Sequence, residues 1–355
     1  MKVMKKILLI LAIVLGVVLL AGVSLVTYLT ITEFRPEAEE PVEVADPVDK
    51  PLDKTDFTVL TWNVGYCALG EESDFFMDGG KQTRPKSEDW ITKNFAGVRG
   101  FLSGKNADFV LLQEVDSDSR RSYSFDQVAA LREKLALPSA YALNYSCNFV
   151  PIPFPPLGKV HSGLLSFSQY GISEAKRISL PCPFSWPMSA VNLKRCLLVN
   201  RVPIAGSEKE LVLVNLHLEA YDDGEGKLAQ SKQLREFLAA EYEKGNYVVA
   251  GGDWNQVFPR SEKSWPNTHK DLWTPGYLDE AELDEGWRYV WDASVPTCRL
   301  LNQPYDPADT ENTQYYVIDG FLVSPNLNVE EVRTLDEGFA FSDHNPVLLS
   351  LTLGE

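Results

Sequence analysis

The sequence predicts one α/β domain behind an N-terminal membrane helix and a linker. From residue 56 onward, short apolar runs of β-forming residues alternate with segments whose apolar residues recur at helical spacing. No linker-like stretch interrupts residues 56–355, and 355 residues with 45% hydrophobic composition can form one large domain or two small ones. We therefore expect a single domain whose strands are buried on one or both faces.

The first element is residues 7–31, an uncharged run without proline. As a helix this run would rise roughly 37 Å, which exceeds the ~30 Å hydrocarbon core of a bilayer. The apolar part of a signal peptide is shorter, about 7–15 residues, so an uncleaved anchor is favoured over a cleaved signal. Three lysines precede the run and an acidic stretch follows it, so the positive-inside rule places residues 1–6 in the cytoplasm. The sequence thus predicts a single-pass protein of the cell membrane with an extracytoplasmic domain.

Residues 32–55 are rich in Pro, Glu and Asp and lack apolar periodicity, which predicts an extended, solvated linker. The first 55 residues hold six basic and eight acidic groups, so −15 of the formal net charge of −17 falls on the remaining 300 residues. A domain this acidic does not favour a nucleic-acid groove, although a site that recruits divalent cations offsets its own negative field.

The five cysteines are scattered and odd in number, so they do not form a disulfide framework. Buried free thiols are one expectation, and a single Cys182–Cys196 bridge outside the cell is the alternative.

Seven apolar segments are predicted as strands, at residues 57–64, 108–115, 161–168, 210–218, 246–254, 315–324 and 345–353. Three segments with helical spacing are predicted as helices, at residues 87–104, 124–137 and 227–245, the last ending at Gly245 as a C-cap.

Two insertions interrupt this alternation. Residues 144–158 are apolar and rich in proline, and prolines exclude a central strand. Residues 259–313 are loop-like and contain four tryptophans. We expect both insertions to pack onto the sheet edges, with a role in binding substrate or lipid as the alternative.

Polar side chains stand at the ends of nearly all the predicted strands. Each alone has a structural explanation, because Asn and Asp suit turns. Together they would bury several carboxylates, which is costly unless a cation or shared protons compensate. Because such sheets bind ligands at their strand ends, we expect one site formed by Asn63, Glu114, His217, Asp253, Asn255, Asp319, Asp343 and His344.

The residue types in this site restrict its chemistry. Carboxylate and amide oxygens suit a hard cation such as Mg²⁺, and imidazoles add general-base or phosphate-binding capacity. The four histidines and five cysteines lack the ligand spacing of a structural zinc site. The sequence contains neither a G-x-S-x-G elbow nor a P-loop motif, which excludes serine hydrolases and P-loop enzymes.

The ordered motifs TWNVG, LLQEV, SGLLSFS, VNLHL, GGDWNQ, PTCRL…YYVIDGFLVS and SDHNPV resemble the endonuclease/exonuclease/phosphatase superfamily, which has the deoxyribonuclease-I-like fold. The resemblance covers essentially all of residues 56–355, and GDWN with SDHNPV is its most specific part. It implies a four-layered α/β sandwich, in which two packed and mostly antiparallel β-sheets are flanked by helices.

The resemblance also implies a metal site. Glu114 and Asn63 would hold a divalent cation that neutralises the scissile phosphate, and Asp343 resembles the additional carboxylate on the metal side. Mg²⁺ is the expected ion, with Mn²⁺ or Ca²⁺ as alternatives.

The remaining motif residues would act on the phosphate ester. His344, oriented by Asp319, would act at the attacking water or at the phosphate. Asp253 would position or activate water, and Asn255 would donate a hydrogen bond to the phosphoryl oxygens. His217 would face the leaving group or a phosphate oxygen.

His161 and Arg195 are further candidates for phosphate contacts, with core or surface roles as the alternative. We expect a membrane-anchored, metal-dependent phosphodiesterase for a lipid or a small molecule. A cell-surface nuclease is the first alternative, for which Arg120, Arg121, Lys194 and Arg195 would supply a basic rim. A binding protein of the same fold without turnover is the second alternative, and the sequence indicates no protein partner.

Overall fold

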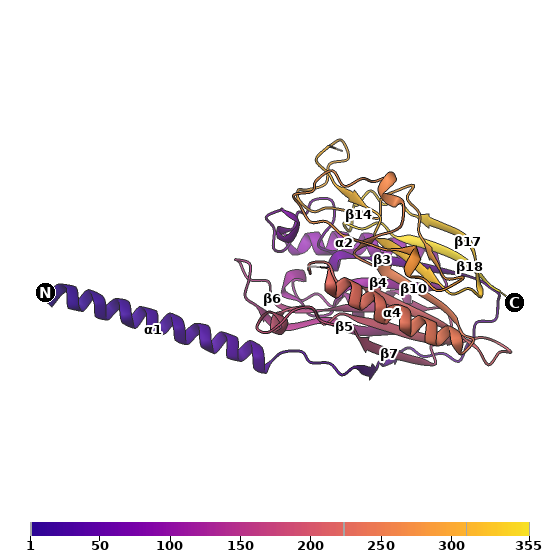
Figure 1. The fold of residues 1–355 in the computed structure, drawn as a ribbon, viewed down its shortest axis with the longest axis horizontal. Coiled ribbons are helices and arrows are strands. Elements are labelled where there is room, and N and C mark those ends of the chain that lie inside the picture. The colour runs from indigo at the N-terminus through magenta and orange to yellow at the C-terminus, as the bar shows by residue number, and fades with distance from the viewer. Residues whose placement is uncertain (1, 223, 310, 355) are drawn as a thin grey trace.

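The computed structural model describes residues 2–222, 224–309 and 311–354, and its core is two seven-stranded sheets packed face to face (Figure 1). The first sheet has the order β1 (Glu39–Pro41), β7 (Glu174–Ser179), β8 (Cys196–Pro203), β9 (Glu210–His217), β10 (Tyr247–Asp253), β16 (Asp319–Val323) and β13 (Arg288–Val290). The second has the order β17 (Leu327–Thr334), β18 (Val347–Leu353), β3 (Asp56–Asn63), β4 (Phe109–Asp116), β6 (Gly158–Ser168), β5 (Ser139–Val150) and β2 (Val44–Ala45).

Each sheet contains one parallel pair, β9 with β10 and β3 with β4, and the other neighbouring strands are antiparallel. The carboxyl ends of the two parallel pairs point toward the same end of the sandwich. That end holds most of the predicted site residues, as described below.

Helices cover both outer faces, which gives four layers. Helix α4 (Glu225–Glu243) packs on the first sheet through a cluster that includes Leu234 and Leu238. Helices α2 (Glu88–Lys105) and α3 (Gln127–Leu135) pack on the second sheet. Apolar residues of both sheets fill the space between them. The expected four-layered sandwich of mostly antiparallel sheets is therefore confirmed.

The strands are apolar on both faces because each sheet lies between helices and the other sheet. In β9, every residue from 211 to 217 is buried. The predicted segment 315–324 divides into β15 (Tyr315–Tyr316) and β16, since Asp319 begins a new pairing with β10.

The prediction for residues 144–158 was partly wrong. Strand β5 continues to Val150 and pairs with β6 over this part, whereas β2 pairs only with residues 139–140, so the first half of this insertion is itself part of a strand at the sheet edge. The four prolines, at 151, 153, 155 and 156, follow the end of the strand and therefore do not interrupt its pairing.

The insertion 259–313 packs on the first sheet, as expected. Its strand β13 forms one edge of that sheet. Trp287 is buried in the cluster that α4 covers, and Trp265 and Trp291 pack against the same cluster. The rest of the insertion contains the short strands β12 (Gly276–Tyr277) and β14 (Cys298–Arg299) and two short 3-10 helices, η5 (Ser261–Lys263) and η6 (Glu280–Glu282).

The linker is extended and largely exposed, as expected, but two short stretches of it pair with the sheets. Residues 39–41 pair with β7 at one edge of the first sheet, and residues 44–45 pair with β5 at one edge of the second. Leu52 is buried and forms a bridge with Ile204. The acidic composition gave no sign of this, because strands this short need only unpaired backbone groups at a sheet edge.

The N-terminal helix α1 (Lys2–Ile31) projects from one end of the molecule, and the C terminus lies at the other end (Figure 1). Among the described residues, α1 is the one helix that is both long enough and apolar enough to cross a membrane. A signal sequence can have the same length and apolar composition. All five cysteines are free, so the alternative of a Cys182–Cys196 bridge was wrong.

Candidate active site

The predicted strand-end residues meet at one end of the sandwich. Asn63 ends β3 and Glu114 lies near the end of β4, while His217 and Asp253 end the parallel strands β9 and β10. Asp319 begins β16 directly opposite Asp253, because these two strands are antiparallel. Asp343 and His344 precede β18, whose first residue pairs with Thr61 of β3. The topology thus brings both sheets' polar ends together.

Asn63 connects the two sheets at the base of the site. Its amide group donates to Glu114 Oε1 at 3.1 Å and to Asp253 Oδ2 at 2.9 Å. Its side-chain oxygen accepts a hydrogen bond from the Gly65 backbone N–H at 3.0 Å, which leaves a second lone pair for another donor or a cation. Asn63 therefore fixes one carboxylate from each sheet.

His344 and Asp319 form a buried pair. His344 Nδ1 lies 2.8 Å from Asp319 Oδ2, and both residues are almost inaccessible to solvent. The Trp62 indole N–H donates to the His344 carbonyl at 2.8 Å and fixes the backbone at this point. Nε2, the second ring nitrogen, is directed toward Asp253 Oδ2 at 3.8 Å and Asp343 Oδ2 at 3.9 Å.

His217 lies on the other side of Asp253. Its Nε2 is 3.3 Å from Asp253 Oδ2, so Asp253 is the acidic partner that the sequence did not identify. Asn255 has a left-handed backbone (φ 51°), and its N–H donates to Asp253 Oδ1 at 2.9 Å. The Asn255 amide donates to the Leu218 carbonyl at 2.9 Å. Asp253 is therefore held from several directions.

Burial and charge change the pKa values of the three central groups. Burial raises the pKa of Asp253 to about 6, although the positive charge of His344 opposes the change. Burial would lower the pKa of His344, but Asp319 and other anionic groups nearby raise it well above its usual value. Burial lowers the pKa of His217 well below its usual value. The site thus pairs one protonated imidazole with one neutral imidazole.

Glu114 points toward Asn63 because β4 is irregular at this point. The register between β4 and β6 shifts between Leu112 and Val115, and Glu114 has φ 54°. Such a bulge turns one side chain away from the regular alternation. The Glu114 side chain is 24% exposed, whereas most of the other site residues are buried.

The carboxylates on this side of the site fit a cation. Burial raises the pKa of Asp343 to about 7, and the negative charges of Glu114 and Asp78 contribute to the increase. A divalent cation would neutralise such a cluster, and carboxylate and amide oxygens are suitable ligands for Mg²⁺. Glu114, Asn63 and Asp343 are therefore chemically able to hold the ion that the family implies.

A second group of potential metal ligands is Asp253, Asp319 and His344, whose ligand atoms lie within 4.8 Å of one another. His344 Nδ1 already has Asp319 as its partner, so only its Nε2 remains free to bind an ion or a phosphate. This geometry is better suited to proton transfer and phosphate binding than to metal binding.

The two additional phosphate-binding candidates lie in different environments. His161 is half-buried on β6, and its ring makes no hydrogen bond among those described. Arg195 is buried, with Nε 3.6 Å from Glu219 and Nη1 donating to the His217 carbonyl at 3.4 Å. Arg195 therefore supports the loop behind His217, and this position does not favour a phosphate contact.

The sequence did not point to Asp78 and Tyr221, which lie beside the metal-side carboxylates. The Tyr221 hydroxyl donates to Asp78 Oδ1 at 3.0 Å. Burial raises the pKa of Asp78 to about 6, and the charges of His344 and Glu114 act on it as well. Both residues come from loops without a motif, so no local pattern could have identified them.

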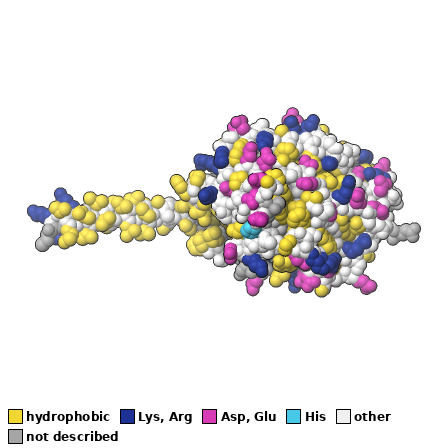
Figure 2. Space-filling view, turned by 90° about the horizontal axis from the view of Figure 1, so that it is seen from above, with side chains coloured by type: hydrophobic (Ala, Val, Ile, Leu, Met, Phe, Trp, Pro, Cys, Tyr) yellow, Lys and Arg dark blue, Asp and Glu magenta, His cyan; other side chains and the backbone are white. Residues whose placement is uncertain are grey.

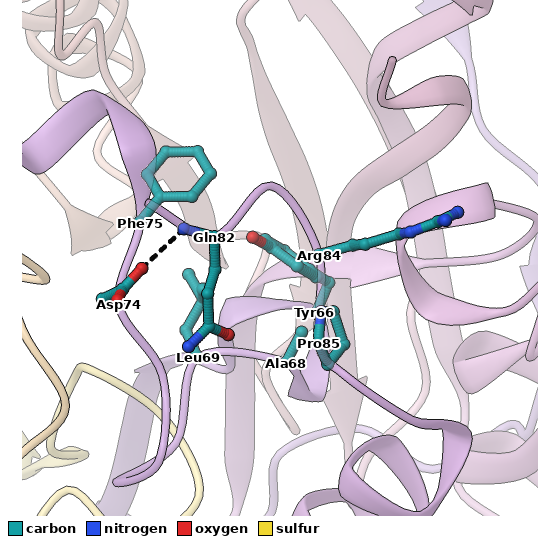
Figure 3. Close-up of a pocket in the computed structure, with 8 residues that line it drawn as sticks. All are labelled: Tyr66, Ala68, Leu69, Asp74, Phe75, Gln82, Arg84 and Pro85. Carbon is teal, nitrogen blue, oxygen red and sulfur yellow. Dashed lines mark hydrogen bonds between the residues drawn. The ribbon is translucent and has the colours of Figure 1, made fainter. Parts of the chain in front are cut away.

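The loop that carries Asp78 is fixed by its own hydrogen bonds. The Asp74 carboxylate accepts from the backbone N–H groups of Lys81 and Gln82, and Gln82 and Asp74 face each other in Figure 3. The small pocket drawn there lies between this loop and the segment that follows Asn63, and it contains none of the predicted site residues.

A two-sheet sandwich with these polar groups at one end belongs to the deoxyribonuclease-I-like phosphoesterase folds. The chain belongs to the Endonuclease/Exonuclease/phosphatase family, whose family model matches residues 60–344. Members of this family are hydrolases that act on phosphodiester bonds. No curated protein matches the chain in sequence.

Solved structures share the fold at low sequence identity. An endonuclease/exonuclease/phosphatase from Beutenbergia cavernae has a TM-score of 0.56 and 19% identity, covering 85% of this chain and 72% of that chain. ANGEL2, described as a 2′,3′-cyclic phosphatase and solved with adenosine-2′,3′-vanadate, has a TM-score of 0.56 and 14% identity, covering 89% and 99%. TDP2 from Caenorhabditis elegans has a TM-score of 0.52 and 16% identity, covering 85% and 76%.

Proposed function

We propose that this chain is a membrane-anchored, divalent-metal-dependent phosphodiesterase whose catalytic domain lies outside the cytoplasm. The observation that carries the proposal is the Asp253 carboxylate, which lies between His217 at 3.3 Å and His344 at 3.8 Å. The second of these histidines is paired with Asp319. A buried carboxylate beside a charged imidazole is suited to attack of water on a phosphorus atom.

In this proposal Asp253 takes the proton of the attacking water. A carboxylate with a pKa of about 6 is a stronger base than an exposed one and is still ionised at neutral pH. His344 is protonated because Asp319 and other anionic groups outweigh the effect of burial on its pKa. Its Nε2–H would therefore donate to the phosphate and stabilise the charge that develops there. His217 and Asn255 would complete the contacts to the phosphoryl oxygens and the leaving group.

Glu114, Asn63 and Asp343 would hold the divalent cation beside this group. When bound, Mg²⁺ would neutralise charge on the scissile phosphate, as would Mn²⁺ or Ca²⁺. Asn63 has a further role, because its amide fixes Glu114 relative to Asp253. The spacing between the metal side and the base is thereby set by one side chain.

The membrane anchor in this proposal is α1. Its most apolar 18-residue stretch has a mean hydropathy of 3.1, and its side chains are exposed almost throughout. A helix of this kind is unstable in water unless a bilayer or another protein covers it. The lysines before it favour the orientation that leaves the domain outside the cytoplasm.

A lipid or small-molecule phosphodiester is favoured as substrate over a nucleic acid. Three of the four cations that could form a basic rim are neutralised within the protein. Arg121 pairs with Asp116 at 3.0 Å, Lys194 with Glu33 at 2.9 Å and Arg195 with Glu219 at 3.6 Å. Of these four cations, three are then less able to bind the phosphates of a nucleic-acid backbone.

The test uses the full chain in detergent with Mg²⁺ or EDTA. Bis-p-nitrophenyl phosphate, p-nitrophenyl phosphate, duplex DNA and sphingomyelin vesicles are assayed in parallel for wild type, His344→Ala and His269→Ala. His269 is a matched control, because it is a histidine outside the set of site residues and its ring contacts the Thr268 hydroxyl. We expect metal-dependent hydrolysis that His344→Ala loses and His269→Ala retains. A preference for DNA would favour the nuclease alternative, and no hydrolysis with Mg²⁺, Mn²⁺ or Ca²⁺ would favour a binding protein.

A further inference from the structure

The end of α1 is packed on the domain rather than separated from it. Leu29 is buried in a cluster with Tyr145, Val150 and Ala190, and Leu25 packs against the same cluster. The Trp186 indole N–H donates to Thr30 Oγ1 at 2.9 Å. With the paired linker, these contacts fix the direction in which the helix leaves the domain.

The length of α1 determines how deep in a bilayer the contacts at its C-terminal end would lie. The uncharged residues 7–31 span roughly 37 Å as a helix, whereas the hydrocarbon core is ~30 Å thick. The last turn of α1 therefore reaches the headgroup region. The parts of the domain that touch Leu25, Leu29 and Thr30 must lie at that level as well.

Two loops beside the end of α1 expose large apolar side chains. Residues 151–157, between β5 and β6, present Ile152 and Phe154, the latter 94% exposed. The segment between β7 and β8 presents Trp186 and Met188, at 60% and 47% exposed. Figure 2 shows apolar side chains continuing from the helix onto the domain where the two meet. A contiguous patch of this kind in a water-exposed position marks an interaction surface.

The same two loops leave the sheets at the active-site end. In the β4–β6 pair, Asp116, two residues after Glu114, lies opposite Ser162, so the loop before β6 extends past the metal-side carboxylates. In the β8–β9 pair, Leu197 lies opposite Leu216, so the loop before β8 lies next to His217. The apolar surface and the candidate active site therefore share one end of the sandwich.

We propose that the loops 151–157 and 183–189 rest on the bilayer into which α1 inserts, with their apolar side chains at the boundary between headgroups and acyl chains. The partner is the lipid bilayer itself, because the patch is continuous with the membrane helix. Tryptophan and phenylalanine are suited to this boundary. The inference rests on the proposed anchor, and it means that the active site opens toward the headgroups of the adjacent leaflet.

The experiment measures the environment of single fluorophores on the full chain in phosphatidylcholine vesicles. Four cysteines are buried, so Cys182→Ser removes the more accessible thiol. In that background Phe154→Cys and Ile152→Cys are each labelled with an environment-sensitive dye. The matched control is Asn328→Cys, an exposed position of β17 at the opposite end of the second sheet. Iodide in water and nitroxide-labelled lipid are the two quenchers.

We expect the labels at 152 and 154 to be quenched several-fold more by the lipid nitroxide, and several-fold less by iodide, than the label at 328. Equal quenching by iodide at all three positions, in a chain that floats with the vesicles, overturns this inference and leaves the anchor intact. A chain that does not float overturns both. Hydrolysis of bis-p-nitrophenyl phosphate by the same samples tests the phosphodiesterase separately, because this soluble diester needs no membrane contact.

Discussion

At the scale of single residues, Asp253 Oδ2 is the point on which the site converges. It accepts a hydrogen bond from Asn63 and lies close to His217 and His344. A carboxylate with this many polar neighbours is held in one position, although burial makes its ionised form costly. Its pKa is therefore the property of the site with the clearest consequence for activity.

We expect kcat/KM to rise with pH through about 6, as Asp253 loses its proton, and to fall at high pH as His344 loses its own. The acidic limb follows from the raised pKa of Asp253, because a base acts only when ionised. Asp253→Asn should lower kcat by about 10²–10⁴-fold and remove this limb from the residual activity. An acidic limb that persists in the variant would assign the base to another group.

Asp319→Asn tests the Asp319–His344 pair. The change keeps the size of the side chain and removes its charge, so the pKa of His344 should fall and the alkaline limb should move to lower pH. We expect kcat to fall by about 10²–10⁴-fold, with the thermal midpoint little changed. Asp292→Asn is the control, at a half-buried carboxylate outside the site that accepts hydrogen bonds from the Ser294 hydroxyl and the Thr334 backbone N–H. An unchanged alkaline limb would show that Asp319 does not set the charge of His344.

At the scale of elements, two adjacent glycines allow β10 to deliver Asp253. A Cβ at Gly252 would lie 1.9 Å from the Leu216 carbonyl of β9, and a Cβ at Gly251 would lie 2.5 Å from the Phe321 ring. Only glycine permits this close approach of the parallel strands. The approach sets the distance between His217 and Asp253, which lie opposite each other in the register.

Gly252→Ala should therefore lower both stability and activity. We expect the free energy of unfolding to fall by about 1–3 kcal/mol, and kcat to fall because β9 and β10 must separate. The control is Gly100→Ala in α2, where a Cβ meets nothing within 4 Å. That change should stabilise the protein by about 0.5–1 kcal/mol. The measurement is denaturant unfolding together with hydrolysis of a diester, and equal stability of the two variants would contradict the argument.

The strands also show which parts of the structure could be predicted from the sequence and which could not. The seven apolar segments were confirmed as strands, because burial on both faces leaves continuous apolar runs. The register shift in β4 that turns Glu114 toward Asn63 could not be predicted, since it depends on the pairing of β4 with β6. Motifs marked the strand-end residues, whereas Asp78 and Tyr221 come from loops whose positions depend on tertiary contacts. The structure gives the positions of the site residues, whereas their catalytic roles stay predictions.

At the scale of the whole molecule, the linker belongs to the folded domain. It adds a strand to one edge of each sheet and buries Leu52 against both. Charge and proline content predicted solvation, but edge pairing depends on backbone groups that composition does not report. The boundary expected at residue 56 therefore separates β1, β2 and Leu52 from the sheets that they contact.

A chain that begins at residue 56 should be less stable than one that begins at residue 32. The shorter chain lacks Leu52 and both edge strands, and burial of a leucine of this kind contributes about 2–5 kcal/mol. Thermal unfolding of the two chains, neither of which contains α1, measures the difference. If both chains had the same thermal midpoint, the linker would contribute nothing to stability and would act only as a tether. Leu52→Ala in the longer chain separates the apolar contribution from the strand pairing.

The pairing of the linker also orders events during synthesis. Glu39 pairs with Ile178, and Val44 pairs with Ala140, so the linker emerges long before its partner strands exist. Until those strands are made, the linker has no edge to join, so β1 and β2 pair only after β7 and β5 have been synthesised. In the proposed anchored protein, α1 would hold these waiting strands next to the bilayer during that time. Once paired, the chain's own N-terminal segment covers part of the β5 and β7 edges, and that part is no longer available to another molecule.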